Sequence, residues 1–466
     1  MSSNAYAHFI GIGGAGMSGI AHVLHERGVA VTGSDLKMSR YAKQLEDAGV
    51  PVAIGHRAEN LGEPEVVVIS SAIPESNPEL AEARRRDLPV WPRAKMLAHL
   101  AEERQTIAVA GTHGKTTTSS MIATMLAAVG TDPTFLIGGE LNDMAANARC
   151  GAGSYYVVEA DESDGSFLYL DPNVAVITNV EADHLDHYAD LAAVEAAFRA
   201  FCAKVPDDGV IVLLGDQPGI ERVLPGAAGR VITYGESEGV DVRCHALHVQ
   251  GLGHEFAVTT ADGRSVAAKV RVPGRHNVLN ATAAIAVAWH LGLDLEAAAA
   301  GVAAFSGVRR RFDLVGVVDG VTIVDDYAHH PTEVRATLAA ARQGDFDRVW
   351  VVFQPHRYSR TAALGGEFGR AFGDADRLVL MDVYGAGEAP IPGVSGKTIL
   401  DAVLRSRPRA QAAYFPHRAD VEAYVLGKVR PGDLVLTMGA GDVTSIGGEL
   451  IRALADRAGV RRSECR

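Results

Sequence analysis

The stretch that decides the fold of this chain is GTHGKTT, which consists of Gly111, Thr112, His113, Gly114, Lys115, Thr116 and Thr117. An apolar, β-branched run precedes it at residues 106–110, and an amphipathic run follows at residues 117–129. This order predicts a strand, a glycine-rich loop and a helix, in which backbone N–H groups and the helix N-terminus face a phosphate group. Val109 stands where the usual pattern has glycine, so the loop is a variant form.

Two side chains of this loop carry groups that a bound nucleotide needs. Lys115 would neutralise the β- and γ-phosphates, and the hydroxyl of Thr116 would hold Mg²⁺, a cation that prefers oxygen ligands. A glycine turn with an incidental lysine is the alternative, and the predicted strand and helix around the loop argue against it. The middle of the chain is therefore expected to bind a nucleotide through its phosphates.

A second glycine-rich stretch, GIGGAG at residues 11–16, lies between a predicted strand at 7–11 and a predicted helix at 17–27. Asp35 follows at the end of a further strand, which matches the dinucleotide fingerprint in spacing and context. The pattern encodes a tight turn, a close approach to a diphosphate and a carboxylate for hydroxyl groups, so any nucleotide diphosphate fits. An NAD-dependent dehydrogenase is the alternative, but it leaves GTHGKTT unexplained.

The pattern of strands and helices starts anew after residue 105, and again after the arginine run at 309–311. At roughly 150 residues per domain, a chain of 466 residues is expected to hold about three domains. We therefore predict an α/β protein with domains at 1–105, 106–313 and 314–466. The first and third are expected to be Rossmann-like. The central one is expected to be a phosphate-loop ATPase with a mixed sheet, because residues 231–272 alternate like antiparallel strands.

The charge balance excludes some classes of partner. The chain has 44 lysines and arginines against 57 aspartates and glutamates, a net charge of −13. Such a chain repels polyphosphate backbones, so nucleic acid is not an expected partner. No apolar run is long enough for a membrane span and no export signal is visible, so a cytoplasmic location is expected.

Two acidic stretches each follow a predicted buried strand. EADESD at residues 159–164 begins with Glu159, and NVEADHLDH at residues 179–187 contains His184. Carboxylates and imidazoles at strand ends beside a phosphate loop are natural ligands for a metal ion and a substrate. A solvated acidic loop is the alternative for the first stretch.

Three further stretches carry unusual polar groups. DDYAHHP at residues 325–331 and QPHRYSR at residues 354–360 each follow a predicted core strand, and the two arginines of the second can grip a carboxylate from one side of a helical turn. The alternative is a helix start with solvent-facing arginines. RHNVLN at residues 275–280 precedes a predicted helix at 281–289, and offers groups for an adenine edge or plain helix caps.

Taken in this order along nearly the whole chain, the motifs resemble those of the Mur ligase family. The motifs that carry the resemblance are GIGGAGMSGIA (11–21), GTHGKTTT (111–118), EADESD (159–164), DDYAHHPTE (325–333) and FQPHRYSR (353–360). The resemblance implies three domains, for a UDP-sugar, ATP and an amino acid in turn. It implies that the carboxylate of UDP-N-acetylmuramate attacks the γ-phosphate of ATP, and that the amine of L-alanine then attacks the acyl phosphate.

The resemblance also implies roles for single residues, with ATP and Mg²⁺ as cofactors. Lys115 would stabilise the migrating phosphoryl group, Thr116 and Glu159 would hold one Mg²⁺, and His184 would hold a second near the γ-phosphate. ATP would also contact the rest of the phosphate loop and His276, Asn277, Asn280, Arg311 and Asp326. The UDP-sugar would contact Gly13, Gly14, Asp35, His56, Ser70 and Ser71. L-Alanine would contact Tyr327, His356, Arg357 and Arg360.

Several points stay open. Some relatives carry a carbamylated lysine after the metal-binding histidine, and here the matching position holds Arg199, whose fixed charge is one replacement; Lys204 is a second candidate for the modification. A non-catalytic nucleotide sensor and a ligase that adds a tripeptide to the same sugar nucleotide are alternative functions. The chain is expected to be a monomer or a homodimer.

Overall fold

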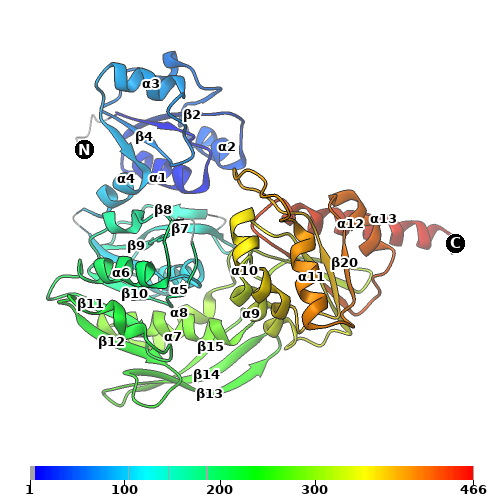
Figure 1. Ribbon diagram of the computed structural model, residues 1–466. Coiled ribbons are helices and arrows are strands. Elements are labelled where there is room, and N and C mark those ends of the chain that lie inside the picture. The colour runs from blue at the N-terminus through cyan, green and yellow to red at the C-terminus, as the bar shows by residue number, and fades with distance from the viewer. Residues whose placement is uncertain (1–5, 103, 145, 185–186, 465–466) are drawn as a thin grey trace. The chain divides into compact units, whose positions relative to one another are not determined.

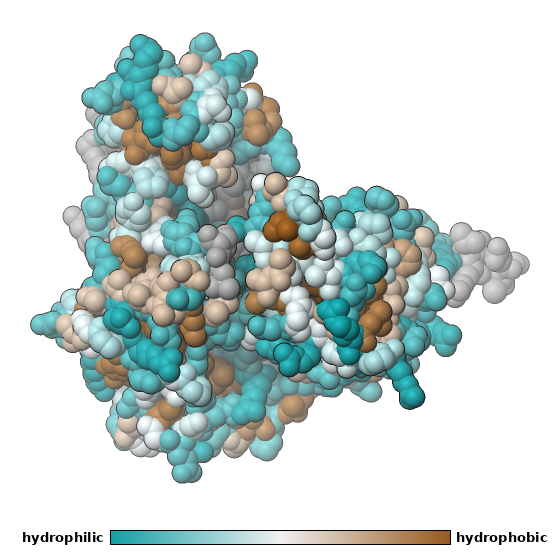
Figure 2. Space-filling view, in the orientation of Figure 1, coloured by the Kyte–Doolittle hydropathy of each residue, from teal (hydrophilic) through white to brown (hydrophobic). Residues whose placement is uncertain are grey.

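The computed structural model describes residues 6–102, 104–144, 146–184 and 187–464. Within these ranges the chain forms three sheets with flanking helices, which Figure 1 colours in turn from blue to red. Its contacts divide it into two compact units: residues up to 245 with 257–268 and 279–305, and residues 246–256, 269–278 and 306 onward. Hydrophilic side chains cover much of the face drawn in Figure 2. No helix in the described ranges is long and apolar enough to cross a membrane.

The first sheet is parallel, with the strand order β3-β2-β1-β4-β5. Its central strand β1 is buried on both faces, since Phe9 packs into one core cluster and Ile10 into another. This arrangement confirms the predicted Rossmann-like fold. The elements are β1 (Tyr6–Ile10), α1 (Ala15–Glu26), β2 (Ala30–Asp35), α2 (Arg40–Asp47), β3 (Val52–Ile54), η1 (Ala58–Leu61), β4 (Val66–Ile69), α3 (Pro78–Arg85), β5 (Val90–Pro92) and α4 (Arg93–Ala101).

The central sheet has the strand order β15-β14-β13-β12-β11-β10-β6-β9-β7-β8. The strands from β12 to β7 in this order run parallel, and β8 is antiparallel to β7, so the predicted mixed sheet is confirmed. The elements are β6 (Gln105–Ala110), α5 (Lys115–Ala128), β7 (Thr134–Leu141), β8 (Ala146–Arg149), β9 (Tyr155–Glu159), η2 (Ser166–Tyr169), β10 (Val174–Ile177), α6 (Leu191–Cys202), β11 (Val210–Leu214), η3 (Ile220–Val223), β12 (Arg230–Gly235), β13 (Val242–Gln250), β14 (Gly253–Thr260), β15 (Ser265–Val270), α7 (Arg275–His290) and α8 (Leu295–Ala304).

The prediction of antiparallel strands over residues 231–272 is wrong at its start. β12 runs parallel to β11 and also to β13, which it meets at Tyr234 and Gly235. The links from β13 to β14 and from β14 to β15 are too short for a parallel crossover, so those strands form hairpins. The alternation of apolar and polar residues shows which face of a strand is buried but not which way the strand runs, and this is why the first pair was misjudged.

The third sheet has the strand order β16-β17-β21-β18-β19-β20. All neighbours run parallel except β16, which is an antiparallel edge strand on β17. A parallel sheet with an antiparallel edge fits the predicted Rossmann-like fold, and the sequence analysis missed the edge strand. The elements are β16 (Asp313–Val318), β17 (Val321–Asp326), α9 (Pro331–Ala341), β18 (Arg348–Phe353), α10 (Tyr358–Ala371), β19 (Arg377–Leu380), α11 (Gly396–Ser406), β20 (Ala412–Tyr414), α12 (Arg418–Leu426), β21 (Asp433–Met438) and α13 (Thr444–Glu464).

Helix α7 corrects a second prediction. The helix expected at 281–289 begins at Arg275, directly after Gly274, which has a φ of +99°. His276, Asn277 and Asn280 therefore lie inside the first turns of the helix instead of before it. Histidine and asparagine read as loop residues in the sequence because their intrinsic helix propensity is low, but the first turn of a helix tolerates them.

Candidate active site

The phosphate loop connects β6 to α5, and its backbone conformation requires glycine at two points. Gly111 has a φ of +134° and Gly114 a φ of +84°, a region that side-chain-bearing residues rarely adopt. Gly114 precedes the first residue of α5, so the first N–H groups of the helix point into the loop. An added Cβ on Gly114 would lie 3.0 Å from Oδ1 of Asn280, which places the side chain of Asn280 beside the loop.

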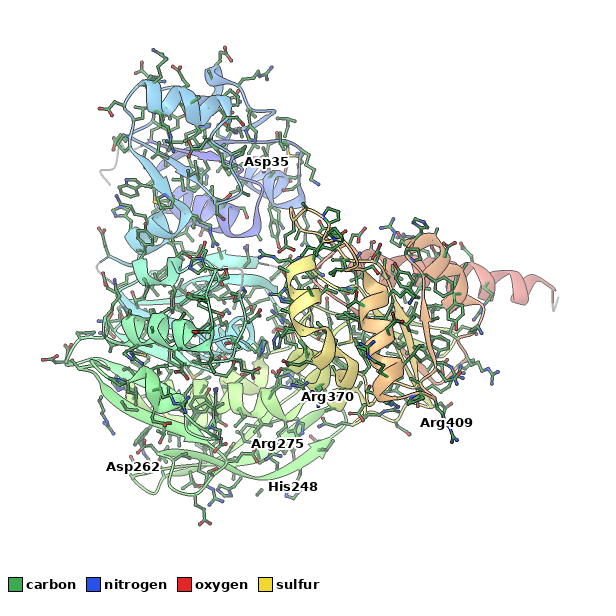
Figure 3. The ribbon with its side chains drawn as sticks, in the orientation of Figure 1. Asp35, His248, Asp262, Arg275, Arg370 and Arg409 are labelled. Carbon is green, nitrogen blue, oxygen red and sulfur yellow. The ribbon has the colours of Figure 1, made fainter. Side chains whose placement is uncertain are left out.

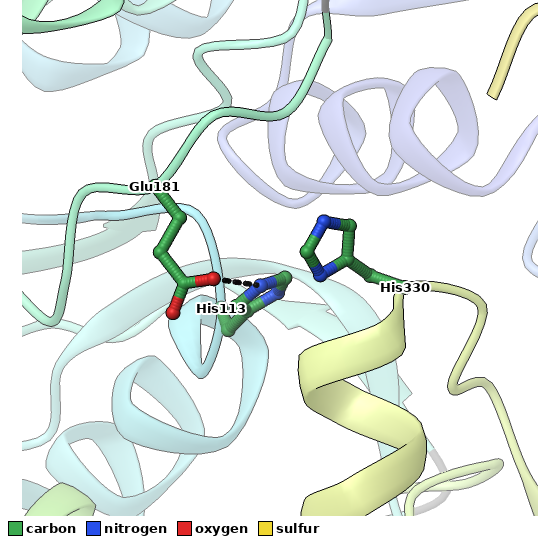
Figure 4. Close-up of side chains that lie close together, drawn as sticks. All are labelled: His113, Glu181 and His330. Carbon is green, nitrogen blue, oxygen red and sulfur yellow. Dashed lines mark ion pairs between the residues drawn. The ribbon is translucent and has the colours of Figure 1, made fainter. Parts of the chain in front are cut away.

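The end of β10 holds the loop in shape. Thr178 donates its hydroxyl to the carbonyl of His113 at 2.6 Å, and Asn179 bonds both the carbonyl and the N–H of His113 at 2.9 Å. Nε2 of His113 also lies 3.7 Å from a carboxylate oxygen of Glu181, the ion pair drawn in Figure 4. Sequence reasoning gave Thr178 and Asn179 no supporting role, and it interpreted the stretch that contains Glu181 as ligands for a metal ion and a substrate. The signal for a supporting role was the place of these residues at the end of a predicted strand.

Lys115 is turned toward the loop itself. Its Nζ donates to both carboxylate oxygens of Glu162 at 2.9 and 2.8 Å and to the carbonyl of Gly111 at 2.7 Å. Burial disfavours the charge on Lys115, but the carboxylates of Glu162 and Asp161 outweigh it and raise the pKa of the lysine. The ammonium group of Lys115 is therefore held by the carboxylate of Glu162 and the carbonyl of Gly111, at the place where a phosphate is expected.

Oxygen ligands for a divalent cation lie next to Lys115. Thr116 donates its hydroxyl to Oε1 of Glu159 at 3.1 Å, and the N–H of Gly138 fixes Oε2 of Glu159 at 2.8 Å. A hydroxyl and a carboxylate are ligands that Mg²⁺ prefers, so this pair fits the predicted metal site. Thr117 lies half-buried in the first turn of α5, one position further on.

His184 lies on the same side as the buried acidic residues. Its Nε2 is 3.6 Å from Oε1 of Glu162 and 3.8 Å from Oδ2 of Asp183. Its φ of +55° is unusual for a residue other than glycine, and such strain is concentrated at functional positions. Glu162 therefore lies near both His184 and Lys115. This contact joins the phosphate loop and the second acidic stretch into one site. Leu185 and Asp186 of the second acidic stretch lie outside the described residues.

The fingerprint loop of the first sheet is closed by its own carboxylate. The N–H of Gly13 donates to Oδ2 of Asp35 at 2.9 Å, and Ser39 donates to the carbonyl of Gly13 at 2.8 Å. Gly14 directly precedes α1, so the N-terminus of that helix also points to this place. Figure 3 marks Asp35, which ends β2. His56 lies on the loop after β3, the strand that pairs with β2, and its Nδ1 is 2.9 Å from Oγ of Ser34.

Ser70 and Ser71 line a cavity of about 270 Å³ in the first unit. Its other walls come from the start of α4 at Arg93 and from the loop that follows the first acidic stretch, at Asp164 and Ser166. The cavity therefore connects the carboxyl end of the first sheet with the acidic loop of the central sheet. A ligand in this cavity would contact both segments.

In the second unit, burial governs the charges of the predicted adenine and ribose contacts. Burial, helped by the charge of Arg311, lowers the pKa of His276 to about 4. Burial raises the pKa of Asp326 to about 6 against the opposing effect of Arg311. Asp326 accepts the N–H groups of Ala328 and Phe312 at 2.7 and 2.8 Å. Asn277 is also in this unit, and its side-chain amide donates to the carbonyl of Pro273 at 2.7 Å.

A row of rings runs through the predicted amino-acid site. Tyr327 meets His329 edge-on with ring centroids 5.2 Å apart, His329 meets His356 at 5.7 Å, and His356 stacks on Tyr384 at 5.9 Å. The guanidinium of Arg311 lies 5.0 Å from the centre of the Tyr327 ring. Sequence reasoning assigned roles to Tyr327 and His356 but not to the other two rings.

The two arginines after β18 differ in exposure. Arg360 is only 9% exposed and its Nη1 lies 3.4 Å from Nδ1 of His356, so the alternative of solvent-facing arginines is wrong for Arg360. Arg357 caps α10 with a φ of +69°. Burial, and then the charges of Arg360 and Arg357, lower the pKa of His356 to about 4. A neutral imidazole beside two cations favours an anionic ligand at this place.

The predicted residues thus form two groups. The phosphate loop, Asn280, the metal ligands and the UDP-sugar candidates belong to the first unit, and the remaining ATP and amino-acid candidates belong to the second. Arg199 donates to the carbonyl of Arg222, and Lys204 donates to the carbonyl of Leu168. Neither contact tests whether Arg199 replaces the modified lysine of relatives, so this stays a prediction.

Comparison with known proteins gives matches along the whole chain. A UDP-N-acetylmuramate–L-alanine ligase of Myxococcus xanthus is 47% identical over 97% of this chain and 95% of its own. The crystal structure of a UDP-N-acetylmuramate–alanine ligase from Thermotoga maritima has a TM-score of 0.82 at 29% identity and covers 97% of this chain and 99% of that one. A murein peptide ligase from Psychrobacter arcticus covers the same shares with a TM-score of 0.74 at 27% identity.

Three family models match consecutive parts of the chain. They are described as the catalytic domain of the Mur ligase family at residues 6–105, the Mur ligase middle domain at 109–288, and the glutamate ligase domain of Mur ligases at 310–441. Together with the parallel first sheet, the phosphate loop between β6 and α5, and the full-length relatives, these matches show that the chain belongs to the Mur ligase family.

Proposed function

We propose that this chain joins L-alanine to the lactyl carboxylate of UDP-N-acetylmuramate, giving UDP-N-acetylmuramoyl-L-alanine, ADP and phosphate. The observation that carries the proposal is the 47% identity to a UDP-N-acetylmuramate–L-alanine ligase over 97% of the chain. The hydrogen-bonded pairs Lys115–Glu162 and Thr116–Glu159 support it, because phosphoryl transfer needs a cation and oxygen ligands at one phosphate loop.

The proposal assigns one substrate to each part of the chain. Residues 1–105 bind the UDP-sugar, residues 106–313 bind ATP, and residues 314–466 bind the amino acid. In the first part, the glycines Gly13 and Gly14 let the backbone of the fingerprint loop approach the diphosphate closely. The other contacts to the UDP-sugar come from Asp35, His56, Ser70 and Ser71. The cavity beside Ser70 and Ser71 supports this assignment, since it leads to the acidic loop of the central sheet.

The first chemical step activates a poor electrophile. The carboxylate oxygen of the sugar nucleotide attacks the γ-phosphorus of ATP, the bond to the β-phosphate oxygen breaks, and ADP leaves. Lys115 neutralises the charge on the transferring group, and the N–H groups of the loop from Gly111 to Thr117 bind the phosphates. Thr116 and Glu159 would hold one Mg²⁺ and His184 a second, and these ions would supply further positive charge at the phosphates.

The second step forms the amide. The amine of L-alanine attacks the acyl carbon, the bond from that carbon to the phosphate oxygen breaks, and the nitrogen gives up a proton. Arg357 and Arg360 bind the carboxylate of L-alanine, with Tyr327 and His356 beside it. His276, Asn277 and Asn280 contact the adenine, Asp326 the ribose, and Arg311 a phosphate of the nucleotide.

The proposal includes a cytoplasmic protein that acts on small molecules, with no nucleic-acid partner, as a monomer or a homodimer. A second candidate is a ligase that adds a tripeptide to UDP-N-acetylmuramate. The similarity to the murein peptide ligase favours this candidate. Its sequence identity of 27% is lower than the 47% identity to the alanine ligase.

One experiment separates the candidates. Phosphate release from ATP and Mg²⁺ with UDP-N-acetylmuramate is measured with L-alanine, with the tripeptide, with L-glutamate and without an acceptor. Release that requires L-alanine is expected. Release only with the tripeptide would move the chain to the second candidate, and no release with any acceptor would show that the sugar substrate is wrong.

A further inference from the structure

A carboxylate is buried in the first sheet's domain, away from the phosphate loop. Glu79, in the first turn of α3, is 0% exposed, and so is Ser34 near the end of β2. A buried carboxylate is costly unless several donors satisfy it, so its partners show what it is built to hold.

The partners of Glu79 come from three separate segments. Oε2 accepts the hydroxyl of Ser34 at 2.6 Å and lies 3.1 Å from Nε2 of His8 on β1. Oε1 accepts the N–H of Arg57 at 3.1 Å and the side-chain amide of Asn60 at 2.6 Å. Burial opposes the charge of Glu79, but His8, Ser34 and the other donors lower its pKa to about 2. The carboxylate is therefore ionised, and each of its oxygens only accepts hydrogen bonds.

Because the carboxylate of Glu79 only accepts hydrogen bonds, it determines which nitrogen of His56 and of His8 carries the proton. The single hydrogen of the Ser34 hydroxyl goes to Glu79, so the contact of 2.9 Å between Ser34 Oγ and His56 Nδ1 needs a proton on Nδ1 of His56. In the neutral ring, Nε2 of His56 is then an acceptor. The same logic puts the proton of His8 on Nε2, and its Nδ1, 2.8 Å from the hydroxyl of Thr32, accepts from it.

The chain order connects this network to the nucleotide-binding edge of the sheet. Ser34 precedes Asp35, whose carboxylate closes the fingerprint loop at Gly13. His56 follows β3, which pairs with β2 in the register Asp35↔Ile54. The side chain of His56 is 11% exposed, so part of its ring reaches the surface where β2 and β3 end.

We propose that Glu79 is a positioning residue for UDP-N-acetylmuramate: through Ser34 it holds His56 with a proton on Nδ1, so that Nε2 accepts a hydrogen bond from the uridine part of the substrate. This inference rests on the proposed function. The donor on the ligand is an N–H or an O–H, which in uridine means N3–H of the base or a hydroxyl of the ribose.

The test is Glu79→Gln in the full-length protein. The amide of glutamine donates as well as accepts, so it can turn the Ser34 hydroxyl toward Nδ1 of His56 and move the ring proton to Nε2. Losing one hydrogen bond to the ligand is expected to raise the KM for UDP-N-acetylmuramate about tenfold. The kcat and the KM values for ATP and L-alanine are expected to stay unchanged, and Ser34→Ala is expected to show the same split.

Two ligand arms identify the donor. Binding of UDP alone is measured by calorimetry, together with N3-methyl-UDP and 2′-deoxy-UDP. Wild-type protein is expected to bind one of the two analogues more weakly than UDP, and Glu79→Gln is expected to lose that difference. Nitrogen NMR of the His56 ring, expected to show Nδ1–H in the wild type, reads the tautomer directly.

The matched control is Glu82→Gln on the same helix, since Glu82 pairs with Arg85 at the surface. It is expected to leave all constants unchanged. If Glu79→Gln and Ser34→Ala lower only the melting temperature while the KM for the sugar nucleotide stays fixed, the positioning role is overturned. If the wild type binds UDP with the expected pattern but releases no phosphate with L-alanine, the proposed function fails and this inference does not.

Discussion

The Nζ atom of Lys115 lies between the two carboxylate oxygens of Glu162, at 2.9 Å from one and 2.8 Å from the other, and both side chains are almost fully buried. The pair keeps the lysine charged inside the loop that is proposed to bind ATP. Removing either partner leaves the other as an uncompensated buried charge, which links the stability of the loop to its function.

The first prediction concerns this pair. Lys115→Met is expected to abolish phosphate release and to lower the free energy of unfolding by about 3–5 kcal/mol, because Glu162 loses its partner. The double variant Lys115→Met, Glu162→Gln is expected to recover most of the stability but none of the activity. Urea unfolding and phosphate release measure the two effects. Equal stability of the single and the double variant would contradict the prediction.

The second prediction concerns His184, a proposed ligand of Mg²⁺. His184→Ala is expected to raise the Mg²⁺ concentration needed for half-maximal activity and to lower kcat by about a hundredfold, since a charge near the transferring phosphate is lost. His187→Ala is the matched control, because His187 is exposed three positions further on. An unchanged Mg²⁺ titration for His184→Ala would remove this residue from the metal site.

The third prediction concerns the carboxylate of the amino acid. Arg360→Lys keeps the charge but loses the planar fork, so the KM for L-alanine is expected to rise about tenfold or more, with the KM for ATP unchanged. Arg370→Lys on the exposed side of the same helix, labelled in Figure 3, is expected to have no effect. Initial rates at varied L-alanine concentrations measure the KM for L-alanine. A rise in the KM for ATP alone would contradict the binding of the L-alanine carboxylate by Arg360.

The fourth prediction concerns pH. Burial lowers the pKa values of His276 and His356 to about 4 from an unfolded value near 6.5, so the unfolded chain binds more protons between these values. The free energy of unfolding is therefore expected to fall as the pH drops from about 6.5 to about 4. The raised pKa of Asp326, about 6, works in the opposite direction over the same window and offsets part of the loss.

Unfolding curves at pH 7 and pH 5 measure this dependence. In His276→Gln and His356→Gln the loss of stability between the two pH values is expected to be smaller than in the wild type. A loss of the same size in both variants would show that other groups cause the acid sensitivity.

The sequence was sufficient to predict the three sheets and the loop between β6 and α5, because apolar runs next to glycines have few structural solutions. The direction of β13 and the start of α7 were not predictable, because alternation and propensity are weak signals at such positions. The supporting roles of Glu162, Thr178 and Asn179 depend on contacts between segments far apart in the chain. Their place after a strand indicates a role, but it does not identify the partner.

The cavity beside Ser70 and Ser71 has a consequence for inhibition. Its walls combine the UDP-sugar candidates Ser70 and Ser71 with Asp164 and Ser166 of the acidic loop, around a volume of about 270 Å³. A compound bound there would contact Ser70 and Ser71, the proposed contacts of the sugar nucleotide, together with the acidic loop at Asp164. A resistance substitution in these walls would have to exclude the drug without disturbing the natural substrate, and few side chains meet both demands.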